Sequence, residues 1–197
     1  MIPHQPSLFA GCAGQAPATE LTITATVLQA WQARVRAYQL PLRTAQICQQ
    51  PSLFSPAPGS AEIAAAAGNT TDPFSLPPQN LQFWRWPDPP HQGAALYFVL
   101  DHSEGAAQAL LLYVGETCQA DRRWKGDHDC KNYLAAYAET LVRCGITPCF
   151  SIRFWCDAPA NAKARRSLEQ QQIRHWLPPF NKECRQRWQT PFQSEGR

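Results

Sequence analysis

Five residues of this chain have types and spacing that could support chemistry: Tyr97, Tyr113, Arg123, Glu169 and Asn181. A guanidinium is permanently charged and planar, so it can bind two phosphate oxygens at once. A carboxylate binds hard divalent cations, and a phenol can pass on a proton when its surroundings favour ionisation. Together these types would suit a phosphate ester, provided that the fold brings them together.

The densest signal is the segment 113–131, which reads YVGETCQADRRWKGDHDCK. It begins at the end of an apolar strand, turns through polar residues and reaches a basic, aromatic cluster at 122–125. Thirteen of the eighteen Lys and Arg residues lie between 122 and 188. A basic second half is compatible with a polyanionic ligand, although an ordinary solvated surface explains it equally well.

Two apolar segments, 95–101 and 109–115, alternate as strands around a polar turn at 101–105. A hairpin centred on Gly105 would place Tyr97 directly opposite Tyr113 on one face of the sheet. Further elements are predicted in the order helix, helix, strand, helix, at 118–125, 131–143, 149–155 and 162–176. The predicted fold class is therefore α/β of the α+β kind, with a small, mainly antiparallel three-stranded sheet flanked by helices.

The last predicted helix has Asn161 as its cap and ends before Pro178, and Glu169 lies beside its apolar stripe. Near the start of the chain, a helix capped by Thr26 should carry one apolar stripe and end at Pro41. That stripe comprises Val27, Trp31, Val35 and Tyr38, with Gln29, Gln32, Arg36 and Gln39 on the opposite face. We expect residues 1–92 to form an accessory segment that packs on a domain spanning 93–183, followed by a tail at 184–197.

These residues and the order of the elements resemble the catalytic domain of the GIY-YIG nuclease family over about residues 93–183. Tyr97 corresponds to the tyrosine of the first motif, which reads Ala-Leu-Tyr here and lacks its glycine. Tyr113–Gly115 matches the second motif, and Arg123 lies ten positions after Tyr113, as the family's helix arginine does. Glu169 corresponds to the metal-binding glutamate of the last helix and Asn181 to the asparagine after a proline-containing bend.

Two positions fit the family less closely. His128 is similar to a histidine or tyrosine that some members place nearby, but it lies one residue away from the usual spacing. Glu116 stands where several repair-type members have lysine, and an acid there would weaken the attraction of phosphate. Glu116 would either lie beside the metal or mark an altered activity.

The resemblance implies a metal-dependent endonuclease that hydrolyses phosphodiester bonds in DNA, including branched or damaged DNA. It implies that Glu169 holds Mg²⁺ or Mn²⁺, that Arg123 binds the scissile phosphate and that Asn181 anchors the site. Either Tyr97 or Tyr113 would take the proton of the attacking water, with His128 as a second candidate. The alternatives are a protein on the same fold that binds nucleic acid without cutting it, and a structure-specific or RNA nuclease.

The eight cysteines form no CxxC pair, and a His128–Cys130 spacing alone does not indicate zinc. The first residues lack a basic start with a long apolar core, and no apolar run has the ~18 residues of a membrane span. These features predict a cytoplasmic protein with reduced thiols that does not enter a membrane. They leave its oligomeric state open.

Overall fold

A computed structural model describes residues 23–48, 71–82, 92–120 and 129–192 of the chain. Its sheet has three antiparallel strands in the order β2-β1-β3, with the bounds Ala95–Asp101 for β1, Leu110–Thr117 for β2 and Phe150–Trp155 for β3. The described helices are α1 (Ala25–Cys48), α3 (Asp129–Arg143), α4 (Ala162–Trp176) and α5 (Arg185–Trp188), with 3₁₀ turns η2 (Ala106–Gln108) and η3 (Lys182–Cys184). The predicted fold class is confirmed.

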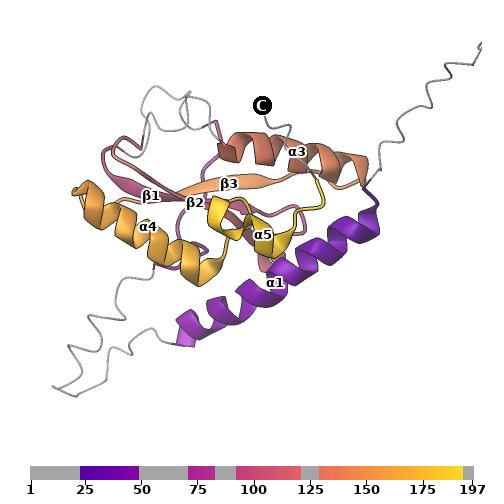
Figure 1. The fold of residues 1–197 in the computed structure, drawn as a ribbon, viewed down its shortest axis with the longest axis horizontal. Coiled ribbons are helices and arrows are strands. Elements are labelled where there is room, and N and C mark those ends of the chain that lie inside the picture. The colour runs from indigo at the N-terminus through magenta and orange to yellow at the C-terminus, as the bar shows by residue number, and fades with distance from the viewer. Residues whose placement is uncertain (1–22, 49–70, 83–91, 121–128, 193–197) are drawn as a thin grey trace, which may run out of the picture.

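Helices cover both sides of the sheet, and α3 and α4 lie on opposite sides of it (Figure 1). Successive strand residues point to opposite faces, so contacts show which helix covers which face. Tyr137 of α3 stacks on Phe150 of β3, with ring centroids 5.8 Å apart. From the other face, Glu116 of β2 binds Arg165 of α4. The central strand β1 is consequently buried along its whole length.

The predicted register of the β1–β2 hairpin is wrong, because the residue opposite Tyr97 lies two positions beyond the predicted partner, Tyr113. Tyr97 pairs with Gly115 and Val99 pairs with Tyr113, so the two tyrosines share a face but are diagonal neighbours. The cause is the connection between the strands, which contains η2 and a bulge at Val99/Leu100 instead of a symmetric turn. The tyrosine rings still meet, with centroids 5.9 Å apart.

Helix α4 has the predicted bounds, and the Asn161 side chain accepts hydrogen bonds from the amides of Lys163 and Ala164, at 2.9 and 3.1 Å. Helix α3 begins two residues earlier than predicted, at Asp129. It closes before Gly145, whose φ of 77° is a conformation that glycine adopts without strain. The short helix predicted at 118–125 falls largely on residues 121–128, which lie outside the described part of the chain.

Helix α1 differs from its prediction at both ends. Thr24 caps it, accepting a hydrogen bond from the amide of Val27 at 3.4 Å, and Val27 is half exposed. Pro41 does not end the helix, which continues to Cys48. The turns around Pro41 are held by side-chain packing, because the guanidinium of Arg43 lies 4.0 Å above the Phe74 ring.

The buried face of α1 also includes glutamines that were expected at the surface. Leu28, Trp31 and Val35 join the core, together with the polar side chains of Gln32 and Gln39. Gln32 donates to the hydroxyl of Tyr137 at 2.7 Å. This hydrogen bond offsets part of the cost of burying the Gln32 amide, and a periodicity argument cannot anticipate it.

One core joins the two ends of the described chain. The Trp31 ring of α1 packs against the rings of Tyr137, Phe180 and Phe192, at centroid distances of 5.6, 6.5 and 5.6 Å. Trp188 and Phe192 are 5% and 4% exposed, so the fold continues past residue 183. Helix α1 therefore packs directly on elements that follow residue 92.

The outer edge of β3 is paired with the segment 71–82. Gln79 and Ile152 exchange two backbone hydrogen bonds of 2.9 Å. The guanidinium of Arg153 donates to the carbonyls of Phe74 and Leu76, at 2.6 and 2.7 Å. This short segment therefore covers an edge that would otherwise leave backbone groups exposed.

The outer edge of β2 is paired with side-chain amides instead of a strand. Gln39 of α1 donates to the Leu111 carbonyl and accepts from the Leu111 amide, both at 2.9 Å. Asn181 likewise donates to the Val114 carbonyl at 2.8 Å and accepts from the Val114 amide at 2.9 Å. Between them, the amide of Phe180 donates to the Leu112 carbonyl at 3.0 Å. A side-chain amide offers a donor and an acceptor as a peptide does, so it can replace a strand neighbour.

We predict that Gln39→Leu lowers the free energy of unfolding by about 2–4 kcal/mol, because it leaves a buried amide and a buried carbonyl of Leu111 unpaired. Urea denaturation measures the change. The matched control is Gln29→Leu, an exposed glutamine of the same helix, which should change stability by less than about 0.5 kcal/mol. Equal effects of the two substitutions would contradict the edge-pairing role of Gln39.

Candidate functional site

Four of the six predicted site residues lie in the described structure. Tyr113, Glu169 and Asn181 come together around one pocket, although they are far apart in the sequence. Tyr97 lies behind Tyr113 and is fully buried. Arg123 and His128 lie outside the described residues, so their placement remains a prediction.

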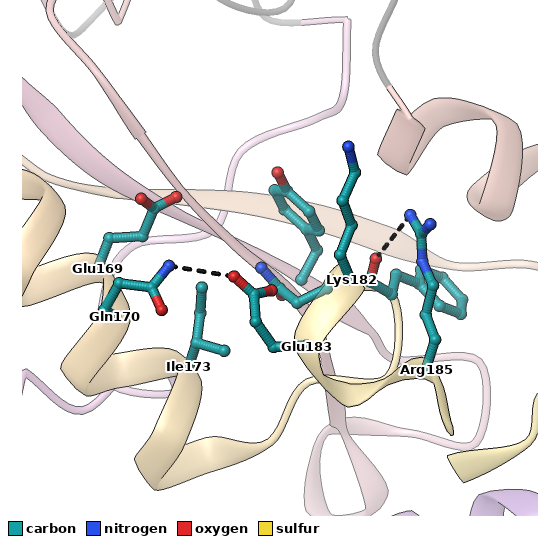
Figure 2. A pocket seen from close by; sticks show the side chains of 9 residues that line it. Glu169, Gln170, Ile173, Lys182, Glu183 and Arg185 are labelled. Carbon is teal, nitrogen blue, oxygen red and sulfur yellow. Dashed lines mark hydrogen bonds between the residues drawn. The ribbon is translucent and has the colours of Figure 1, made fainter. Parts of the chain in front are cut away.

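The pocket has a volume of about 190 Å³ and lies between β2, α4 and the turn after α4. Figure 2 shows the side chains that surround it, with the Glu169 carboxylate extending from α4. The residues that line it are Tyr113, Glu169, Gln170, Ile173, Phe180, Asn181, Lys182, Glu183 and Arg185. It therefore combines a phenol, two carboxylates and two cationic side chains.

The two tyrosines form a hydrogen-bonded pair of which Tyr113 reaches the pocket. Burial raises the pKa of Tyr113 well above the usual value of a phenol, and the neighbouring Tyr97 and the Glu169 carboxylate raise it further. The Glu169 carboxylate would repel a phenolate, and burial disfavours it. In this state the Tyr113 hydroxyl therefore keeps its proton at neutral pH.

Gly115 is required by the position of the Tyr97 ring. A Cβ atom at residue 115 would lie 2.8 Å from Cε1 of Tyr97 and still closer to the end of that ring. Tyr97 cannot easily yield, because its ring also packs against Tyr113 and Phe154. The glycine of the Tyr-Val-Gly sequence thus makes room for the tyrosine of the neighbouring strand.

Helix α4 is fixed to β2 by a buried ion pair one turn before Glu169. The guanidinium of Arg165 binds the Glu116 carboxylate at 2.5 Å and donates to the carbonyls of Pro159 and Ala160, at 3.1 and 3.0 Å. The Arg165 side chain is 4% exposed, and Arg166 adds a second cation 3.5 Å from Glu116. Glu116 is thereby held against α4 and does not line the pocket.

The donors in the pocket suit a divalent cation that binds together with a substrate. Glu169 and Glu183 both line it, and Glu183 accepts a hydrogen bond from Gln170 at 3.1 Å. Within the described ranges, no group of three or more His, Cys, Asp or Glu residues is placed to hold a metal ion. Mg²⁺ does not need such a cage, because it commonly keeps several waters and is held by one or two carboxylates and substrate phosphates.

Lys182, Glu183 and Arg185 are the charged pocket residues that the sequence did not single out. They follow Asn181 directly, but the sequence placed residues from 184 onward in a tail. The available signal was the basic content of this stretch, KECRQR, immediately after the predicted anchor. Composition alone does not distinguish such a run from a solvated surface.

Comparisons of the chain with protein-family models, curated proteins and solved structures give no match. Among the described helices, none combines the length and apolar character needed to cross a membrane.

We predict that Gly115→Ala destabilises the protein by about 1–3 kcal/mol, because the added methyl group collides with a packed ring. Thermal or urea unfolding measures this cost. The same substitution in a Tyr97→Leu background should cost much less, since the ring has been removed. Equal costs in both backgrounds would show that Tyr97 is not what excludes a side chain at 115.

The raised pKa of Tyr113 predicts alkaline sensitivity. The folded state holds this proton more tightly than the unfolded chain, so the stabilisation is complete below about pH 10 and declines as pH rises above it. Tyr137, whose pKa is also raised by burial and by Asp101, adds to the same decline. Each tyrosine steepens the loss of unfolding free energy by up to about 1.4 kcal/mol per pH unit. Urea unfolding between pH 9 and 11 should show a shallower decline in Tyr113→Phe, and an unchanged slope would contradict the assignment.

Proposed function

We propose that this chain is a metal-dependent endonuclease that hydrolyses phosphodiester bonds in DNA, on a fold that resembles the GIY-YIG nuclease domain. One observation carries the proposal: Tyr113, Glu169 and Asn181, which the family resemblance selects from the sequence, border a single pocket. A chance similarity in three scattered positions would not require them to meet. The contact of Tyr97 with Tyr113 adds a fourth position.

Each of these residues has a role that its surroundings support. Tyr113 is the phenol that faces the substrate, and Tyr97 is its buried hydrogen-bond partner. Asn181 contacts no substrate in this scheme, because both ends of its amide are used on Val114. It fixes the turn after α4 against the strand that carries Tyr113.

Glu169 would hold Mg²⁺ or Mn²⁺ in the pocket, with the substrate phosphate and water as further ligands. Such a cation polarises the phosphate and stabilises the leaving oxygen. Tyr113 starts as a neutral phenol, so it must lose its proton before it can take one from the attacking water. Arg123, which the family resemblance assigns to the scissile phosphate, would supply positive charge that favours this ionisation.

The competing proposal is a protein that binds nucleic acid on this fold without cleaving it. A binding protein has no need for a carboxylate beside a phenol in its pocket, since Glu169 would repel phosphate. That Glu169 and Tyr113 line the same pocket therefore favours catalysis.

We predict that Glu169→Gln abolishes cleavage and leaves DNA affinity unchanged or slightly tighter. The substitution keeps the volume of the side chain but removes the charge that binds a hard cation. The cleavage rate should fall by more than roughly a hundredfold, since losing even an outer-shell partner of a metal costs roughly 10–100-fold. Cleavage of plasmid, branched and single-stranded DNA with Mg²⁺ or Mn²⁺ measures the rate, and binding isotherms measure affinity.

The matched control is Glu139→Gln, which makes the same chemical change at an exposed position of α3 that pairs with Arg143. It should leave the cleavage rate within about twofold of the unsubstituted chain. Full activity of a folded Glu169→Gln variant would refute the metal assignment. Binding of DNA by the unsubstituted chain, without cleavage under either metal, would establish the non-catalytic alternative.

A further inference from the structure

We propose that Lys182 and Arg185 form a phosphate-binding element beside the pocket, which holds a backbone phosphate of the nucleic acid next to the one that is cleaved. This inference rests on the proposed function and extends it to residues outside the predicted site. Both side chains line the same pocket as Tyr113 and Glu169. In Figure 2 the charged ends of Lys182 and Arg185 extend to the same side as the Glu169 carboxylate.

Arg185 is held in position before any ligand arrives. Its guanidinium carbon lies 4.3 Å from the centre of the Tyr133 ring, and its Nη2 donates to the Phe180 carbonyl at 3.5 Å. A guanidinium stacked on a ring directs its N–H donors along the edge of the stack, the geometry in which arginine binds phosphate oxygens. Because the side chain is already ordered, binding a phosphate costs little further entropy.

Lys182 is exposed, but the backbone that carries it is fixed relative to the site. The preceding residue, Asn181, is bound to the amide and carbonyl of Val114, next to Tyr113. The following turn is closed by the Cys184 amide, which donates to the Asn181 carbonyl at 3.0 Å. A long ammonium side chain on a fixed base can attract a polyanion without a rigid geometry of its own.

The acid between the two cations is turned toward α4. Glu183 accepts a hydrogen bond from Gln170, and Figure 2 draws this bond on the opposite side of Glu183 from Arg185. Glu183 therefore pairs with α4 and not with Arg185, although all of these side chains line one pocket. A nucleic acid backbone can place one phosphate near Glu169 and its neighbour near Lys182 and Arg185, because successive phosphates are regularly spaced charges.

The chain offers a matched control in Arg187, two residues beyond Arg185. Its guanidinium carbon lies 5.3 Å from the centre of the Tyr38 ring and 5.5 Å from that of Trp188, so it faces α1. Arg187→Gln removes the same charge from the same short helix without touching the pocket. Any general effect of net charge on DNA binding will therefore appear in this variant as well.

The test is the salt dependence of DNA binding by the full chain, measured by fluorescence anisotropy with a labelled duplex in the presence of EDTA. Lys182→Gln and Arg185→Gln should each weaken binding roughly tenfold at low salt. Each should also make the fall of log affinity with log salt shallower, reducing the magnitude of its slope by about 1. The double variant should reduce the magnitude of that slope by about 2. Arg187→Gln should keep the slope of the unsubstituted chain, and thermal melts establish that each variant is folded.

The outcomes separate this inference from the proposed function. If the pocket variants match Arg187→Gln while the unsubstituted chain binds and cleaves DNA, the phosphate-binding element is refuted and the nuclease proposal stands. If the unsubstituted chain does not bind DNA at all, both proposals fail. Restoration of the slope by Arg185→Lys, which keeps the charge, would show that the cation itself is responsible.

Discussion

The arrangement of this protein depends on how the outer edge of β2 is satisfied. β1 pairs with one edge of this strand, and its other edge meets no strand among the described residues. Two side-chain amides and one backbone amide take the place of a neighbour, at Leu111, Leu112 and Val114. An unpaired buried peptide group is costly, so each of these positions must have a partner. The partners come from α1 and from the turn after α4, which ties both segments to the strand.

This constraint explains why the N-terminal helix belongs to the same folded unit as the pocket. Gln39 also donates to the Trp176 carbonyl at 3.3 Å, which links α1 to the end of α4 as well as to β2. The strand that α1 supports carries Tyr113, and the helix end that it contacts leads into Asn181. The elements that form the pocket are therefore held in place by the contacts that α1 makes with β2 and with the end of α4. Removal of α1 would leave the outer edge of β2 without the Gln39 partner and would remove the contact of α1 with the end of α4.

The sequence predicts the parts of this structure that local patterns determine. The bounds of α4, its Asn161 cap and the three strands follow from alternation, periodicity and capping chemistry. The register of the hairpin does not, because it depends on a bulge that only the packed sheet selects. Gln32 and Gln39 were misassigned for a related reason, since a glutamine looks like a surface residue until its buried partner is known. Among the site residues, the family resemblance identifies Tyr113, Glu169 and Asn181. It does not identify Lys182 and Arg185, which line the pocket because the turn after Asn181 places them there.

The electrostatics of the pocket hold Tyr113 in its protonated form. Tyr113 lies between a buried phenol and a carboxylate, and both oppose its ionisation. The described cations of the pocket, Lys182 and Arg185, belong to η3 and α5, after the turn that follows α4. Positive charge near the carboxylate would lower the pKa of this phenol, because it would offset one repulsion and add an attraction. In the proposed enzyme, arrival of the metal and the substrate would therefore create the base that hydrolysis needs.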